Sequence, residues 1–271
     1  MNKINLTCVA PVPIQGHTSK GDQPKWFYKQ RWFKADHMGY ESLSEVLISR
    51  LLTRSNAGEF VTYEPVQIQY QDKEYVGCVS DNFKANNEML IPFERLHRAY
   101  KGRGLAEILG GIDTPVERIR YAVNFVEAVT GLTQVGPYLT TLLELDALFL
   151  NEDRHTNNLA VLRNEHTMEF RLCPIFDNGL ALLSDTNDYP PEDDIYSCIA
   201  RVHAKPFDRD FLTQVEAAEE LYGVQWTPTF CKADVTRELA TLSGLYEENI
   251  LKRVETVLFE QMRRYSYLFQ V

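Results

Sequence analysis

The pattern of apolar residues changes near residue 90, and this change constrains the fold more than any other feature. Before it, β-branched, aromatic or alternating segments predict strands at residues 5–10, 25–34, 61–71 and 74–79, with one helix at 41–54. After residue 91 the pattern is mostly helical. Strands grouped before helices predict an α+β fold, with a small β-rich lobe at 1–90 and a larger helical lobe at 91–271.

The helical part contains clear start and stop signals. Thr114, Pro115 and Glu117 form the pattern of a capping box with proline in the first turn, and Gly131 is placed to end that helix. A second buried helix is predicted at 140–150, and the tail carries one apolar face across 250–262. The 140–150 helix runs directly into a polar loop.

Charge and cysteine usage exclude several classes of protein. A net charge of −10 over 271 residues argues against direct nucleic-acid binding, which needs a dense Lys/Arg surface. The five cysteines lie far apart with no C-x-x-C pair, so we expect neither a zinc site nor disulfides, and a cytoplasmic location. We find no signal peptide and no stretch that could cross a membrane, although secretion by a route without such a signal stays open.

The polar loop, NEDRHTNN at 151–158, contains a concentration of chemically active side chains. Two apolar runs follow at 159–162 and 168–175, separated by a polar turn, and predict a β-hairpin that ends at Asp177. The two ends of an antiparallel hairpin meet, so we expect Asn158 and Asp177 to lie within roughly 5 Å of each other. Asp153 lies on the loop that leads into the same end.

Two carboxylates and one amide therefore converge, and such hard oxygen ligands suit Mg²⁺ bound together with phosphates. Protein kinases place a catalytic Asp five residues before a metal-binding Asn, with a second metal-binding Asp before a Gly further on. Asp153, Asn158, Asp177 and Gly179 have this arrangement. One alternative is that these Asx residues only cap turns. Another is a metal-dependent hydrolase with His155 as a ligand, which the absence of H-x-H and H-E-x-x-H patterns disfavours.

The set N-x-D-R-H-x-x-N, followed after a hairpin by D-x-G, resembles HipA-like protein kinases, and in particular the short, stand-alone CtkA-type members. The order D-R-H and the sequence D-N-G depart from the H-R-D and D-F-G of most protein kinases. The resemblance implies a two-lobed kinase-like fold and a Ser/Thr kinase that uses ATP and Mg²⁺. It implies that Asp153 orients or deprotonates the substrate hydroxyl, while Asn158 and Asp177 hold the metal.

In the small lobe, the resemblance assigns Lys34 to the ATP phosphates, with Glu45 on the next helix as its partner. Lys25 and Lys29 on the same predicted strand are alternatives to Lys34. Glu41 is the alternative partner, because Ser42 and Glu45 also fit a capping box.

The resemblance also concerns the residues around the nucleotide and the catalytic loop. It implies that the 16–21 segment, GHTSKG, covers the phosphates, although an ordinary surface turn explains this composition equally well. We expect Arg154 and His155 to hold the catalytic loop in place. The nucleotide contacts expected are Ser19, Lys20, Gly21, Val79 and Ser80, and the candidates for autophosphorylation are Thr18 and Ser19.

The acceptor and the partners follow from the same resemblance. We expect a protein substrate with a Ser or Thr acceptor, while a small-molecule kinase of the same fold remains an alternative. Larger members of the family carry an extra N-terminal subdomain and work beside a small DNA-binding antitoxin. We expect no room for that subdomain in this chain, which argues against toxin–antitoxin pairing, although a separate antitoxin-like partner stays open. A catalytically silent, kinase-like binding module is disfavoured because the expected Lys, Asp and Asn are all present.

Overall fold

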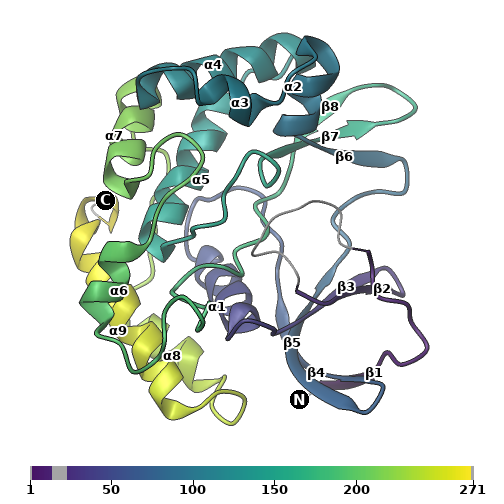
Figure 1. Ribbon diagram of the computed structural model, residues 1–271, viewed down its shortest axis with the longest axis vertical. Helices are drawn as coiled ribbons and strands as arrows, with labels where there is room; N and C mark the ends of the chain where they lie inside the picture. Colours follow the sequence, from purple (N-terminus) through teal and green to yellow (C-terminus); the bar gives the residue numbers. More distant parts are fainter. Residues whose placement is uncertain (1, 14–22, 270–271) are drawn as a thin grey trace.

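The computed structural model describes residues 2–13 and 23–269, and Figure 1 shows a sheet on one side of the molecule and most of the helices on the other. The sheet has five strands in the order β1-β4-β5-β3-β2, with β1 parallel to β4 and the other pairs antiparallel. Its strands are β1 Asn2–Asn5, β2 Lys25–Tyr28, β3 Arg31–Ala35, β4 Glu64–Tyr70 and β5 Lys73–Asp81. Helix α1, Glu41–Leu52, lies between β3 and β4 in the chain.

The rest of the chain is mainly helical, as predicted, so the α+β fold class is confirmed. A second sheet has the order β6-β7-β8, with β6 Glu88–Pro92, β7 Ala160–Asn164 and β8 Phe170–Leu172. The helices are α2 Phe93–Lys101, α3 Leu105–Leu109, α4 Pro115–Thr130, α5 Val135–Phe149, α6 Ile195–Arg201, α7 Phe211–Tyr222, α8 Lys232–Ala240 and α9 Glu248–Arg264, followed by the 3₁₀ turn Ser266–Phe269. Within 2–13 and 23–269, no helix is long and apolar enough to cross a membrane.

Two of the predicted strands are corrected by the structure. The 25–34 segment is a hairpin of β2 and β3, because Lys29 and Gln30 both take positive φ angles (50° and 61°) and reverse the chain. The strand predicted at 5–10 is wrong, since β1 ends at Asn5. There the Asn5 side chain accepts a hydrogen bond from the backbone N–H of Thr7 (2.9 Å), which starts a turn.

The start and stop signals of α4 act as predicted. The Thr114 hydroxyl accepts a hydrogen bond from the backbone N–H of Glu117 (3.3 Å) and donates one to its carboxylate (3.0 Å). Gly131 ends the helix with a left-handed φ of 76°. Helix α5 begins at Val135, earlier than predicted, and Leu150 turns the chain out of it with φ 53°.

The largest hydrophobic core spans both halves of the molecule. Leu43 and Leu47 of α1 belong to the same cluster as buried residues of α4, α5 and α9. A smaller cluster, which includes Trp26, Phe33 and Ile68, belongs to the five-stranded sheet. The predicted boundary at residue 90 falls inside β6, which pairs with β7 of the helical half. Helix α1 is thus anchored in the core of the helical half, although it follows a strand of the other half.

Candidate active site

Strand β3 and helix α1 bring the side chains of Lys34 and Glu45 together. Lys34 Nζ contacts Glu45 Oε1 and lies 2.8 Å from Asp177 Oδ1. Burial alone would lower the pKa of Lys34, but Asp177 and Glu45 raise this pKa well above its ordinary value. Glu45 is fully buried, and its second oxygen accepts the backbone N–H of Asn178 (2.9 Å). Lys34 therefore carries a full positive charge between two carboxylates.

Glu41, the alternative partner of Lys34, has a different role in the structure. Glu41 accepts backbone N–H groups before the helix, including those of Met38 (2.8 Å) and Gly39 (3.0 Å). The capping box proposed for Ser42 and Glu45 is wrong, because the helix begins at Glu41 and Ser42 lies inside it. Ser42 instead donates its N–H to the Asp36 carboxylate (2.6 Å).

The two lysines considered as alternatives to Lys34 lie at different positions in the structure. Lys29 lies in the β2–β3 turn. Lys25 pairs with Lys34 across β2 and β3 and lines a small pocket together with Asp153 and Asp177. From the sequence, Lys25 was only an alternative to Lys34, because its position opposite Lys34 depends on a turn that the predicted single strand did not contain.

Asp177 has an unusual backbone and an unusual charge environment. Its φ is 61°, a left-handed conformation that costs a non-glycine residue about 1–2 kcal/mol and concentrates at functional sites. Burial would raise the pKa of Asp177, yet Lys34 and Lys25 hold it well below the ordinary value. The carboxylate is consequently ionised at neutral pH.

Arg154 connects the 151–158 loop with the segment that carries Asp177 through hydrogen bonds and an ion pair. Its side chain is 1% exposed, and its Nε lies 2.9 Å from the Asp146 carboxylate on α5. The same guanidinium donates to the Phe176 carbonyl (2.9 Å) and to the Asn178 side chain (2.7 Å). One buried cation thus contacts residues on both sides of Asp177.

Asp153 is surrounded by donors and cations from two segments. The Asn158 side-chain amide donates to the Asp153 carbonyl (2.8 Å) and to its carboxylate (3.3 Å). His155 Nε2 lies 3.8 Å and Lys205 Nζ 3.9 Å from Asp153 Oδ1. Burial raises the pKa of Asp153. The charge of Asp177 raises this pKa further, while His155 and Lys205 lower it. The sequence did not predict Lys205, which lies far along the chain without a motif around it.

The predicted hairpin exists as β7 and β8, but its register differs from the prediction. Val161 pairs with Leu172, so the same register extended to Asn158 reaches residue 175 and not Asp177. The ladder stops at Leu172 because Pro174 has no N–H to donate. Strand pairing alone therefore does not place Asn158 opposite Asp177. Both residues adjoin Asp153, Asn158 through its hydrogen bonds and Asp177 across the small pocket.

The donor set around Asp153 fits a hard divalent cation. Asp177 is ionised and lies on the same pocket as Asp153. The nitrogen of the Asn158 amide donates hydrogen bonds to Asp153, so the amide oxygen is the atom of this side chain available as a metal ligand. Carboxylate and amide oxygens are the ligands that Mg²⁺ prefers.

The other predicted nucleotide contacts are only partly described. Val79 and Ser80 lie on β5, where they pair with Phe33 and Trp32 of β3, the strand that carries Lys34. Thr18, Ser19, Lys20 and Gly21 lie outside the described residues.

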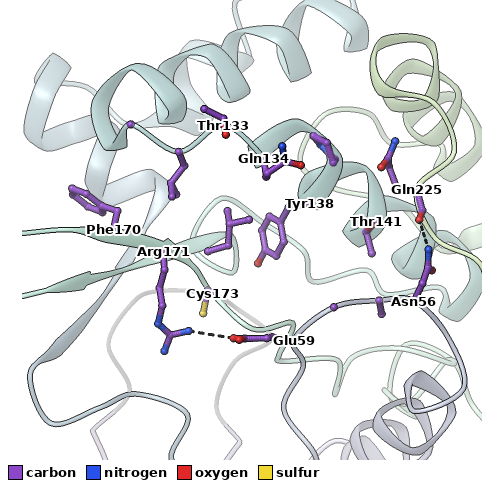
Figure 2. A pocket seen from close by; sticks show the side chains of 16 residues that line it. Asn56, Glu59, Thr133, Gln134, Tyr138, Thr141, Phe170, Arg171, Cys173 and Gln225 are labelled. Atoms are coloured by element: carbon purple, nitrogen blue, oxygen red, sulfur yellow. Dashed lines mark hydrogen bonds and ion pairs between the residues drawn. The ribbon is translucent and has the colours of Figure 1, made fainter.

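A larger cavity of about 780 Å³, shown in Figure 2, is lined by a different set of residues. It is lined by the loop at 56–59, the first turns of α5 and strand β8, and Arg171 crosses it toward Glu59 (3.3 Å). None of the residues predicted from the sequence for catalysis, metal or nucleotide lines it. Cavity size alone thus does not identify the chemistry.

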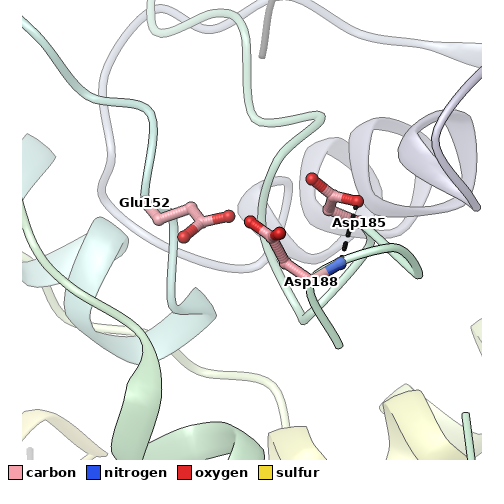
Figure 3. Close-up of side chains that lie close together, drawn as sticks. All are labelled: Glu152, Asp185 and Asp188. Atoms are coloured by element: carbon pink, nitrogen blue, oxygen red, sulfur yellow. Dashed lines mark hydrogen bonds between the residues drawn. The ribbon is translucent and has the colours of Figure 1, made fainter. Parts of the chain in front are cut away.

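A second group of carboxylates was not predicted. Oxygen atoms of Glu152, Asp185 and Asp188 all lie within 4.8 Å of one another, and Figure 3 shows the three side chains facing a common point. The Tyr189 hydroxyl donates to Glu152 (2.8 Å), and Asp185 accepts the N–H of Asp188 (3.4 Å). Glu152 adjoins Asp153 in sequence, but the other two acids come more than 30 residues later, so no motif signals the cluster.

Comparison with solved structures supports the predicted fold. The sequence matches no family model and no curated protein. The structure is similar to the crystal structure of the Helicobacter pylori proinflammatory kinase CtkA, with a TM-score of 0.63 and 17% identity over 96% of this chain and 94% of that chain. It is also similar to a chain of the Shewanella oneidensis MR-1 toxin–antitoxin complex of HipA, HipB and operator DNA, with a TM-score of 0.55 and 12% identity over 94% of this chain and 67% of that one. The two-lobed, HipA-like kinase fold expected from the sequence is confirmed.

Proposed function

We propose that this chain is an ATP-dependent Ser/Thr protein kinase. The observation that carries the proposal is the contact of Lys34 with both Glu45 and Asp177, beside the Asp153–Asn158 pair, in a chain with the fold of CtkA and HipA. Protein kinases need a Lys–Glu ion pair and a metal-binding Asp in place at the same time. A fold can be retained without its chemistry, so the argument depends on these side chains.

The nucleotide side of the mechanism belongs to Lys34. Its charge faces the phosphates of ATP, and Glu45 fixes its direction. Asn158 and Asp177 would hold Mg²⁺, which would neutralise charge on the phosphate oxygens. Contacts from Val79 and Ser80, and from Ser19, Lys20 and Gly21, complete the proposed nucleotide site.

The acceptor side belongs to Asp153. A Ser or Thr hydroxyl oxygen attacks the γ-phosphorus, ADP leaves, and the hydroxyl proton passes to the Asp153 carboxylate. The raised pKa of Asp153 favours this role, because a base works best when its pKa is closer to the operating pH. Most of the rate enhancement would come from positioning and charge neutralisation.

Partners and location are less constrained. The HipA structure named above contains HipB and operator DNA, and we propose at most an antitoxin-like protein partner for this chain. The net charge of −10 argues against direct contact with nucleic acid. All five cysteines are unpaired, which fits the reducing cytoplasm.

Transfer of radiolabelled phosphate from Mg·ATP tests the proposal. We expect the wild type to label a Ser/Thr protein substrate or itself, and Asp153→Asn and Asp177→Ala to abolish labelling. Asp72→Ala is the matched control, because Asp72 is an exposed acid in the β4–β5 turn. Equal labelling by the wild type and Asp177→Ala would exclude the proposed chemistry, while labelling of small molecules alone would indicate the small-molecule kinase.

A further inference from the structure

A separate pocket of about 300 Å³ adjoins Asp153 on the side of the helical lobe. Its walls come from α3, from α4, from the catalytic loop and from the loop after α6. His155 and Lys205 line it, and these two residues also lie within 4 Å of Asp153 Oδ1 (3.8 and 3.9 Å). A molecule in the pocket would therefore contact two residues whose side chains reach the carboxylate that we propose as the base.

The polar wall of this pocket is positively charged. Lys205 has a side chain that is 44% exposed, so its ammonium group can reach a ligand. Arg118 donates to the carbonyls of Ile112 (2.8 Å) and Phe207 (2.8 Å), which orient the guanidinium without neutralising it. In a chain with a net charge of −10, two cations at one pocket are a local exception.

The acidic groups around the pocket have partners. Glu94 accepts the backbone N–H of Ala106 (2.9 Å) and the hydroxyl of Thr156 (2.9 Å), and it pairs with Arg98 (3.3 Å). Asp153 is contacted by the Asn158 amide and lies near His155 and Lys205. Lys205 and Arg118 are cations that line the pocket, and the Lys205 ammonium group also lies 3.9 Å from Asp153 Oδ1.

The loop that carries Lys205 is held in place. Phe207 is fully buried, and the Gln214 side-chain oxygen accepts the backbone N–H groups of Phe207 (2.9 Å) and Asp208 (3.2 Å). The backbone N–H of Ala204 donates to the Arg209 carbonyl (2.9 Å) across the base of the loop. Lys205 thus extends from a fixed position, which specificity for a charged group requires.

We infer that this pocket binds the side chain next to the acceptor hydroxyl, that this side chain is an Asp or Glu, and that Lys205 determines the preference. The inference rests on the proposed protein-kinase function. The apolar wall of Ala106, Leu109 and Pro206 would contact the methylene groups of the acidic side chain. Lys205 would pair with its carboxylate, close to Asp153.

Peptides with one Ser acceptor flanked by Glu, Gln or Lys test the inference with the full-length protein at physiological salt. The readout is the ratio of kcat/KM for the Glu peptide to that for the Gln peptide. We expect this ratio to be about two- to fivefold in the wild type, as for a partly exposed ion pair. Lys205→Gln should bring it near one, and Lys205→Glu should reverse it and favour the Lys peptide.

The design separates recognition from chemistry. A change at Lys205 also alters the surroundings of Asp153, but that effect is common to both peptides and cancels in their ratio. The preference should appear in KM, because Lys205 would contact the flanking side chain and not the atoms that react, so it would stabilise the bound peptide and the transition state equally. Arg209→Glu is the matched control, since Arg209 is an exposed cation of the same loop that does not line the pocket.

The outcomes distinguish this inference from the kinase proposal. Phosphorylated peptides with a wild-type ratio of one, or an unchanged ratio in Lys205→Glu, overturn the inference and leave the kinase. A wild type that neither labels a peptide nor turns over ATP overturns both.

Discussion

Replacing Arg154 with Met tests two roles of this side chain: it stabilises the fold, and it positions the segment that carries Asp177. Arg154 forms a buried ion pair with Asp146, and both side chains are 1% exposed. Burial raises the pKa of Asp146 even with Arg154 beside it, so this carboxylate depends on its cation. The variant leaves Asp146 without a counter-charge inside the core.

The expected magnitude follows from that burial. Removing one partner of a buried ion pair costs about 3–5 kcal/mol of unfolding free energy. For a chain of this size, each kcal/mol lowers Tm by about 2–4 °C, so we expect a fall of roughly 6–20 °C. Arg154→Met should also reduce phosphotransfer, because the Phe176 carbonyl and the Asn178 side chain lose their common donor. A small displacement of Asp177 is enough for a loss of about a hundredfold.

The double variant Arg154→Met/Asp146→Asn provides the decisive comparison. It removes both charges and keeps an oxygen for the Asn151 amide, which donates to Asp146 at 2.9 Å. Urea unfolding should show the double variant to be more stable than Arg154→Met, while phosphotransfer stays low in both. Equal unfolding free energies in the single and double variants would refute the buried-charge argument, and full activity in either would refute the positioning role.

Three further predictions concern charge and modification. Lys34→Met should abolish phosphotransfer and lower Tm at neutral pH, because Glu45 and Asp177 lose the cation between them; scanning calorimetry and labelling measure the two effects. Glu144 has a pKa raised by burial to about 8, so the folded state keeps a proton that the unfolded state releases near pH 4.3. Stability should therefore fall by a few kcal/mol as pH rises from about 4.3 to 8, and Glu144→Gln should flatten that dependence in urea titrations. Incubation with Mg·ATP should add the mass of one phosphate at Thr18 or Ser19 in intact-mass analysis, and no gain would refute autophosphorylation.

Features that depend on neighbouring residues were predictable from the sequence. The limits of α4 follow from Thr114, Pro115 and Gly131, whose conformational preferences operate within one turn. The location of the 151–158 loop after a buried helix also follows, because α5 is mostly apolar and a run of polar groups begins at Asn151. Local chemistry was sufficient in both cases.

Features that depend on strand register or on contacts between distant segments could not be predicted from the sequence. The register of β7 and β8, in which Val161 pairs with Leu172, directs Asn158 toward residue 175 and not Asp177, and the ladder ends before either residue is reached. Lys205 reaches Asp153 only through the loop after α6, which no periodic pattern marks. From the sequence, Glu41 remained an alternative to Glu45 as the partner of Lys34, and the start of α1 at Glu41 separates their roles.

The core of the molecule explains why the small-lobe lysine and the large-lobe carboxylate meet. Helix α1 packs into the hydrophobic cluster of the helical half, so Glu45 has a fixed position relative to α5 and to the backbone of Asn178. Lys34, on a sheet with a separate cluster, is then drawn to Glu45 and Asp177 by charge. The contact between the halves at this point is therefore electrostatic, while the attachment of α1 is hydrophobic.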